Sequence, residues 1–177
     1  MTTTRMTRYD RSMLRVMNDR RGRPLYATAP RRRMVVVAHV ALTVAVVALL
    51  AHFCLSRAEP TWAAVAGAVL LLPWMVATGA INGATRGLLE LRERALDERQ
   101  LAERSRVLAR AHRLMTCLLA GSVAGLLAAG ALDGDALRTY TAPALAAVLV
   151  AHWLMPLWVA GLTAQDEPTE DETAAAL

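Results

Sequence analysis

The chain has 177 residues, of which 55% are hydrophobic and 20% are charged, and its formal net charge is +5. A soluble domain of this length has fewer apolar residues, and here they gather in four blocks of about 20 residues, which excludes a soluble fold. The basic residues are all arginines that flank these blocks, so the basic balance does not indicate a nucleic-acid-binding protein.

The four apolar blocks predict an all-α protein, a four-transmembrane-helix bundle with a cytoplasmic helical extension between helices 2 and 3. A helix that rises about 1.5 Å per residue needs about 20 residues to cross a hydrocarbon core of about 30 Å. No block has Asp, Glu or Arg in its interior, whereas a soluble amphipathic helix carries charges on one face. The predicted spans are residues 34–56, 61–83, 114–132 and 141–163.

Residues 1–33 form a basic N-terminal segment with ten arginines against two aspartates. Within it, residues 5–17 place apolar side chains on one arc of a helix and arginines on the other. Two interpretations stay open. The segment is an amphipathic helix whose arginines contact anionic lipids of the inner leaflet, or it is a disordered tail whose charges only set the orientation of the spans.

The arginines alternate by side along the chain. The central segment, residues 84–113, carries eight arginines against five acids, while the two remaining loops are nearly neutral. The positive-inside rule therefore predicts that the N-terminus, the central segment and the C-terminus lie in the cytoplasm. Abundant alanine and the absence of lysine are typical of GC-rich bacterial genomes, so the expected location is the bacterial inner (plasma) membrane.

Glycines recur at intervals of four residues in two of the spans. Such spacing lets helix backbones approach closely. The strip serves either a dimer interface or packing between helices of the same chain. The glycines concerned are Gly79 and Gly83 in the second span, Gly87 just after it, and Gly121 and Gly125 in the third span.

The central segment is predicted to be helical. Asp97 followed by Gln100 resembles a capping box, so we expect a new helix to begin at Asp97 and to run unbroken through Cys117 into the third span. The second span is expected to continue as a cytoplasmic helix to about Leu96, which gives a helical hairpin that stands off the membrane. The alternative is one surface helix that lies flat.

Histidines in the spans are the most unusual side chains, because ionisable groups are rare there. His39 and His152 are candidates to ligate a haem iron, although their depths differ by roughly 5 to 8 Å along the helix rise. The simpler interpretation is a neutral imidazole bonded to a hydroxyl such as that of Thr43 or Thr78. We therefore expect no cofactor and no metal site.

A weak internal repeat relates the second span to the fourth. Residues 71–77 read Leu-Leu-Pro-Trp-Met-Val-Ala, and residues 154–160 read Leu-Met-Pro-Leu-Trp-Val-Ala. The pattern indicates a duplicated two-helix hairpin. The chain then closes with an acidic segment, residues 164–177, which is predicted to be disordered.

The central run Leu96-Asp97-Glu98-Arg99-Gln100, with the arginines that follow it up to Arg113, resembles a recurring bacterial pattern. Small four-span membrane proteins of unknown function, many from actinobacteria, carry an Asp-Glu-Arg motif just before their third span. The resemblance covers about 30 residues and the four-span layout. It implies a fold and a topology but no activity, and it makes Asp97 and Arg99 candidates for an interaction.

The spans contain no carboxylate and no paired nucleophile and base, so we expect no enzyme. The leading hypothesis is a non-enzymatic binding or accessory subunit, or a self-associating one. Its expected partners are the lipid bilayer and a second copy of the chain or an unidentified membrane protein, and not a nucleic acid. The alternatives are a haem-binding protein and a small transporter or channel with a polar cavity lined by His39, Thr78, Asn82 and His152.

Overall fold

Four long helices dominate the computed structural model, which describes residues 7–17, 22–56 and 61–164. They contain the predicted spans except for Ser56, and each is long and apolar enough to cross a membrane. The shortest has 24 residues, which corresponds to about 36 Å. No strand occurs in the described part of the chain. The four helices are α3 (Ala29–Leu55), α4 (Thr61–Ala84), α5 (Glu98–Leu132) and α6 (Ala136–Thr163).

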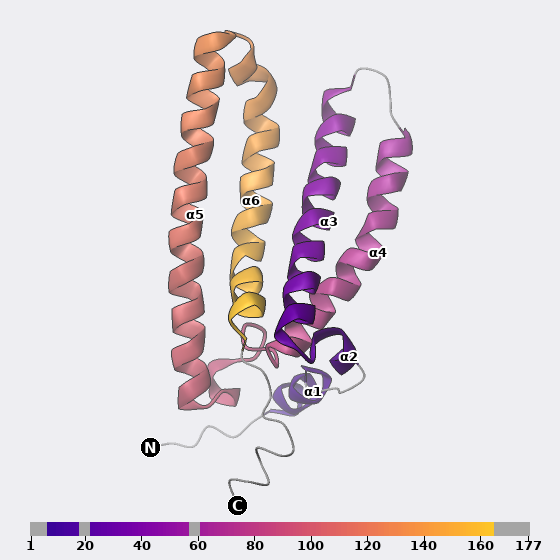
Figure 1. Ribbon diagram of the computed structural model, residues 1–177, viewed down its shortest axis with the longest axis vertical. Helices are drawn as coiled ribbons and strands as arrows, with labels where there is room; N and C mark the ends of the chain where they lie inside the picture. The colour runs from indigo at the N-terminus through magenta and orange to yellow at the C-terminus, as the bar shows by residue number, and fades with distance from the viewer. Residues whose placement is uncertain (1–6, 18–21, 57–60, 165–177) are drawn as a thin grey trace, which may run out of the picture.

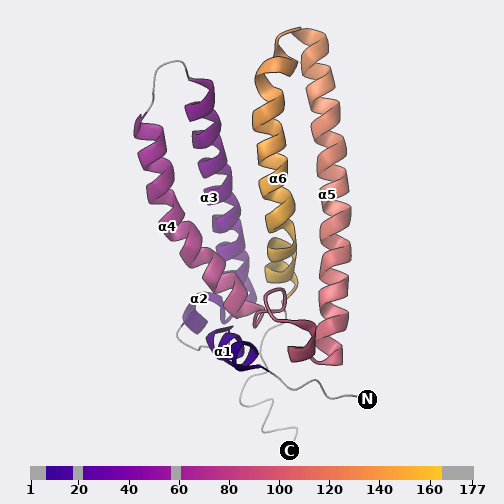
Figure 2. The same ribbon diagram turned by 180° about the vertical axis from the view of Figure 1, so that it is seen from behind.

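The long helices form two antiparallel hairpins that stand side by side (Figures 1 and 2). The hairpin α3–α4 meets the hairpin α5–α6 where α3 and α4 contact α6. From one side of the molecule to the other, the order is therefore α5, α6, α3, α4. The turn between α5 and α6 lies at one end of the molecule, and the starts of α3 and α5 and the ends of α4 and α6 lie at the other, the base of the bundle. The all-helical part of the prediction is confirmed, with a bundle that is built from two hairpins.

The start of α5 is fixed by a reciprocal capping box. Asp97 Oδ1 accepts a hydrogen bond from the Gln100 backbone N–H at 2.7 Å, and Gln100 Oε1 accepts one from the Asp97 N–H at 3.0 Å. These bonds satisfy donors that the first helical turn leaves open. The helix then runs for 35 residues without interruption. The predicted continuous helix from Asp97 through Cys117 is confirmed.

The predicted continuation of the second span to Leu96 is wrong. The helix α4 ends at Ala84, because the Arg86 N–H donates to the Gly83 carbonyl and the Gly87 N–H donates to the Asn82 carbonyl. These two bonds form a Schellman motif, in which Arg86 has the left-handed φ of 51°. Turns and the short 3₁₀ helix η2 (Glu93–Ala95) lead from there to α5. Neither the helical hairpin nor one flat helix over the central segment is present.

Two short helices lie beneath the α3–α4 hairpin at the base of the bundle (Figure 1). They are α1 (Arg8–Met17) and α2 (Arg23–Tyr26). The predicted helix within residues 5–17 is thus present from Arg8 onward, and residues 1–6 lie outside the described residues. Arg32 in the first turn of α3 donates through Nη2 to the Ala164 carbonyl at 2.7 Å, so a cation caps the C-terminal end of α6.

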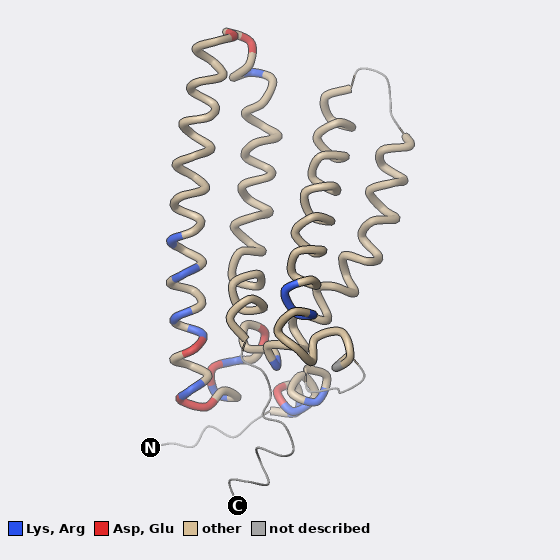
Figure 3. Tube along the Cα trace, viewed as in Figure 1, with Lys and Arg blue, Asp and Glu red and all other residues tan. Residues whose placement is uncertain are grey.

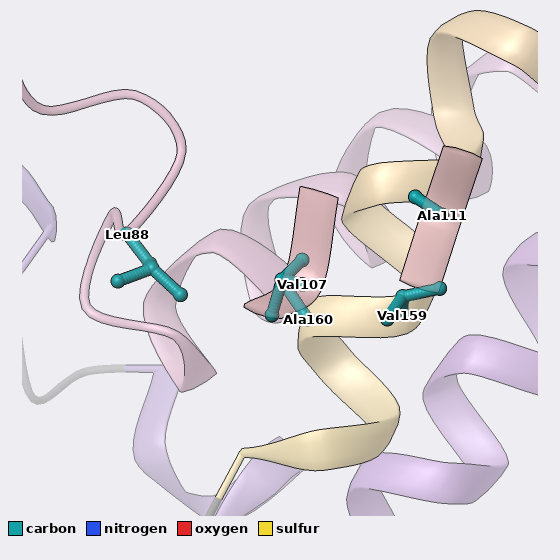
Figure 4. Packing of buried hydrophobic residues seen from close by; sticks show 5 residues of the cluster. All are labelled: Leu88, Val107, Ala111, Val159 and Ala160. Atoms are coloured by element: carbon teal, nitrogen blue, oxygen red, sulfur yellow. The ribbon is translucent and has the colours of Figure 1, made fainter. Parts of the chain in front are cut away.

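Buried side chains gather at the same end of the molecule. One cluster joins Leu88 of the central loop to Val107 and Ala111 of α5 and to Val159 and Ala160 of α6 (Figure 4). The far ends of the helices present large apolar side chains outward, such as Leu127 of α5, which is 62% exposed. Such exposure is unfavourable in water but ordinary in lipid, which is as apolar as leucine. The basic residues of the described chain lie mostly at the base of the bundle (Figure 3).

Candidate functional site

A polar network centred on His39 joins three helices inside the bundle. The His39 side chain is fully enclosed, with 0% of its surface exposed. The Trp158 Nε1–H of α6 donates to His39 Nδ1 at 2.9 Å, and His39 Nε2 lies 2.8 Å from the Thr78 hydroxyl oxygen of α4. Both ring nitrogens are therefore occupied by partners from other helices.

These bonds assign one tautomer to the imidazole of His39. An indole N–H can only donate, so Nδ1 must accept from Trp158 and carries no proton. The ring proton then lies on Nε2 and is donated to Thr78, whose hydroxyl donates in turn to the Trp74 carbonyl at 2.9 Å. A second proton on Nδ1 would oppose the Trp158 N–H, so the network specifies a neutral ring.

A second chain of bonds runs alongside the first. Thr43 donates to the His39 carbonyl at 2.8 Å, and the Trp74 Nε1–H donates to the Thr43 hydroxyl at 2.9 Å. The Trp74 ring centre lies 4.9 Å from that of His39. Each of the two repeated segments, residues 71–77 and 154–160, thus contributes one tryptophan that contacts His39, Trp74 or Trp158. The expected bond between His39 and the Thr78 hydroxyl is confirmed.

The structure does not bring His39 and His152 together. His152 is exposed on α6, and no bond or ring contact between described residues joins the two histidines. Within the described ranges, no group of three or more His, Cys, Asp or Glu side chains is arranged to hold a metal ion. A hollow beside Ile81 and Gly161, between α3, α4 and α6, is too narrow to admit water. The haem-binding protein and the transporter stay predictions without a specific observation in their favour.

The three glycines of α4 and the loop after it do not form one open strip. A Cβ added at Gly83 would lie 3.1 Å from the Tyr26 ring of α2, so this glycine packs within the chain. Gly87 has a φ of 70°, and a Cβ there would lie 2.6 Å from Met17 Cγ of α1. Gly79 alone faces open space, with nothing within 4 Å of an added Cβ.

The glycines of α5 differ from those of α4, because both face open space. Nothing lies within 4 Å of a Cβ added at Gly121 or Gly125. Cys117 is also exposed and lies four residues before Gly121. The three small residues repeat every four positions and therefore share one face of α5, which the described part of the chain leaves uncovered.

An ion pair holds α1 against the central loop. Asp10 is 1% exposed and accepts two bonds from the Arg94 guanidinium, from Nε at 2.8 Å and from Nη2 at 3.2 Å. The Thr7 N–H also donates to Asp10 Oδ2 at 2.8 Å, and the Asp10 N–H donates to the Thr7 hydroxyl, which is a second capping box. The Arg94 guanidinium and the Thr7 amide lower the pKa of Asp10 from its ordinary value of 3.8 to about 2.

Acid is expected to release α1 from the loop. Because the pKa of Asp10 is lowered in the folded chain, the ion pair is fully present above about pH 4, and it is lost as the pH falls toward about 2. A nitroxide attached at the exposed position Val16 (Val16→Cys) should become more mobile across this window. In Asp10→Asn the label should be mobile at every pH, whereas Glu93→Gln should behave as the unaltered chain. A label in Asp10→Asn that is as immobile as in the unaltered chain would contradict this attachment.

Asp97 acts in the structure as the cap of α5, and Arg99 lies two residues further along, in a hollow with Arg106 and Arg110. Sequence reasoning missed the roles of Trp158 and Asp10, whose partners lie 119 and 84 residues away in the chain. The internal repeat of residues 71–77 and 154–160, which places one tryptophan in each segment, is the signal from which Trp158 could have been found.

Comparison with protein-family models, with curated proteins and with solved structures found no match for this chain. The resemblance to small four-span bacterial proteins therefore stays a prediction. What the chain does must be argued from its own residues.

Proposed function

We propose that this protein is a non-enzymatic membrane subunit that associates with a second copy of itself through α5. The observation that carries the proposal is the open strip of Cys117, Gly121 and Gly125, which no other part of the described chain covers. Four helices long and apolar enough to cross a membrane support the membrane location. In this proposal the membrane is the bacterial inner membrane, and the arginine-rich end and both termini face the cytoplasm.

The contrast with other glycines supports a role for this strip. A Cβ at Gly130 would lie 2.6 Å from Leu137 Cγ, so that glycine serves close packing inside the α5–α6 hairpin. Gly121 and Gly125 serve no such contact, although glycine costs about 1 kcal/mol relative to alanine in a helix interior. A pair of glycines four residues apart is the pattern at which two membrane helices approach most closely.

The bonding of His39 and Ser122 supports a binding role. Both ring nitrogens of His39 are held by the protein, and the Ser122 hydroxyl donates to the Leu118 carbonyl of its own helix at 2.8 Å. An enzyme needs a nucleophile or base within hydrogen-bond reach of its substrate. The His39 ring and the Ser122 hydroxyl are instead bonded within the chain.

Cross-linking at Cys117 tests the proposal directly. Copies inserted in the same direction have a symmetry axis along the membrane normal, so the two Cys117 residues lie at equal depth, one turn from Gly121. In the variant Cys54→Ser, which keeps Cys117 as the only cysteine, membranes treated with an oxidant or a short bis-maleimide should yield a covalent dimer. The reciprocal variant Cys117→Ser should stay monomeric.

Matched glycine variants show whether the strip causes the association. Adding Gly125→Leu to Cys54→Ser should lower the dimer yield several-fold, because the leucine separates the backbones. Gly67→Leu on α4 is the control, since a Cβ at Gly67 also meets nothing within 4 Å. Equal dimer yields in Gly125→Leu and Gly67→Leu would contradict the proposal. A failure of Cys54→Ser to form any dimer would contradict it as well. A Cys117 product of a different mass would identify a different membrane protein as the partner.

A further inference from the structure

Three arginines line a hollow between the N-terminal part of α5 and the C-terminal end of α6. The lining residues are Arg99, Glu103, Arg106, Val107 and Arg110 of α5 and Thr163 of α6, and the hollow has room of about 190 Å³. That is the share of about six water molecules in the liquid, which is enough for a phosphate group. Three guanidinium groups against one carboxylate give the lining a formal charge of +2.

The donors in this hollow suit a phosphate. Guanidinium groups bind phosphate oxygens with charge-assisted and often bidentate hydrogen bonds. The Arg106 Nε donates to the Ala102 carbonyl at 3.2 Å, and its two terminal nitrogens are bonded to no other residue that the structure describes. Arg110 has no hydrogen bond or ion pair to any other residue that the structure describes. The same holds for Glu103, so the carboxylate does not neutralise either arginine by direct contact.

The depth of the hollow favours a lipid over a solute. Val107 of its lining packs against Val159 and Ala160, which belong to the fourth apolar span. On α5, the uninterrupted apolar stretch begins at Leu114, about 6 Å beyond Arg110 at 1.5 Å per residue. The headgroup layer of a bilayer is roughly 5 to 8 Å thick on each side. The upper end of the hollow, at Arg110, therefore lies at the level of headgroup phosphates.

We propose that this arginine hollow binds the phosphate of an anionic phospholipid from the leaflet at the arginine-rich end. The site is distinct from the glycine strip, and its lining residues take no part in the His39 network. One competing anion belongs to the chain itself, because five acids occur in residues 166–172, which lie outside the described residues and follow closely after Thr163.

Three single variants of the full chain test the site by lipid titration in detergent, read by native mass spectrometry. The probe is short-chain phosphatidylglycerol, and phosphatidylcholine of equal chain length is the zwitterionic reference. Arg110→Gln should weaken phosphatidylglycerol binding about tenfold, the value of one charged hydrogen bond. Glu103→Gln should strengthen it, because it removes the one carboxylate among the described residues that line the hollow. Arg113→Gln is the control, since it removes the same charge from α5 just outside the hollow.

The outcomes separate the sources of the anion. Equal losses in Arg110→Gln and Arg113→Gln would overturn the proposal in favour of unspecific attraction by charge. Displacement of the lipid by inorganic phosphate at similar concentration would overturn it in favour of a soluble phosphate. Binding that appears only in a chain ending at Ala164 would show that the acidic segment fills the hollow. Repeating the titration in Gly125→Leu keeps the result independent of self-association, and a Glu103→Gln variant that binds no better would also count against the site.

Discussion

Replacing Gly161 with leucine is expected to lower the free energy of unfolding by about 2 to 3 kcal/mol. Gly161 lies where α6 crosses α3 and α4, and a Cβ there would lie 2.8 Å from Val36 Cγ2 and 2.9 Å from Ile81 Cγ2. Both neighbours are β-branched and nearly fixed in their helices. They cannot turn aside, so the helices themselves must move apart and lose the packing around them.

Unfolding in detergent, followed by helical circular dichroism as denaturant is added, measures this loss. Gly67→Leu is the matched control. It adds the same side chain to another helix of the bundle, at a position where nothing lies within 4 Å of an added Cβ. We expect the control to stay within about 0.5 kcal/mol of the unaltered chain. Equal stability of the two variants would show that α6 does not cross α3 and α4 at Gly161.

Replacing His39 with alanine is the second large change, with an expected loss of about 2 kcal/mol. The substitution leaves the Trp158 Nε1–H without its acceptor inside the bundle, and a buried donor without a partner costs about 1 to 3 kcal/mol. Hydrogen bonds between membrane helices are weaker on average, about 0.6 kcal/mol each. The expected loss of stability therefore combines the two hydrogen bonds of the His39 ring with the cavity that alanine leaves in its place.

The same denaturation measures this change, with tryptophan fluorescence as a second reading because Trp74 and Trp158 flank His39. His152→Ala is the control, since that histidine is exposed on α6. His39→Gln should recover part of the loss, because an amide can both donate and accept. If His39→Ala were as stable as His152→Ala, the network would have no structural role.

The spans and the start of α5 were predictable because their causes are local. Twenty apolar residues in succession decide a span, and the bonds between Asp97 and Gln100 connect residues three positions apart. The bond from His39 to Thr78 was also predictable, since a buried imidazole needs a hydroxyl or carbonyl partner.

The loop between α4 and α5 was not predicted, because its charge pattern favours a helix and one of the contacts that hold it is distant in the chain. The charge pairs in that segment are compatible with a helix, but Arg94 is bound to Asp10 of α1, which lies 84 residues earlier. The chain reverses instead at Arg86 and Gly87, the residues with positive φ. A glycine within a helical pattern gave the only local indication of this ending.

The glycine strips show a similar limit. Spacing alone predicts the same role for Gly83 and Gly121 in helix packing. A Cβ at Gly83 would contact Tyr26, however, whereas a Cβ at Gly121 has nothing within 4 Å. The difference depends on where α2 packs, which the spacing of glycines does not encode. The tertiary arrangement was therefore needed to choose the face of α5 as the candidate interface.

Labelling with a membrane-impermeant maleimide tests most directly the claim that four apolar helices span the membrane with the arginine-rich end in the cytoplasm. In a chain without Cys54 and Cys117, one new cysteine is placed at Gly134, in open space at the α5–α6 tip, or at Ser105, exposed on the charged part of α5. Intact cells should label Gly134→Cys, and only lysed cells should label Ser105→Cys. The reverse pattern would contradict the orientation, and recovery of the chain as a soluble protein without detergent would contradict the spans.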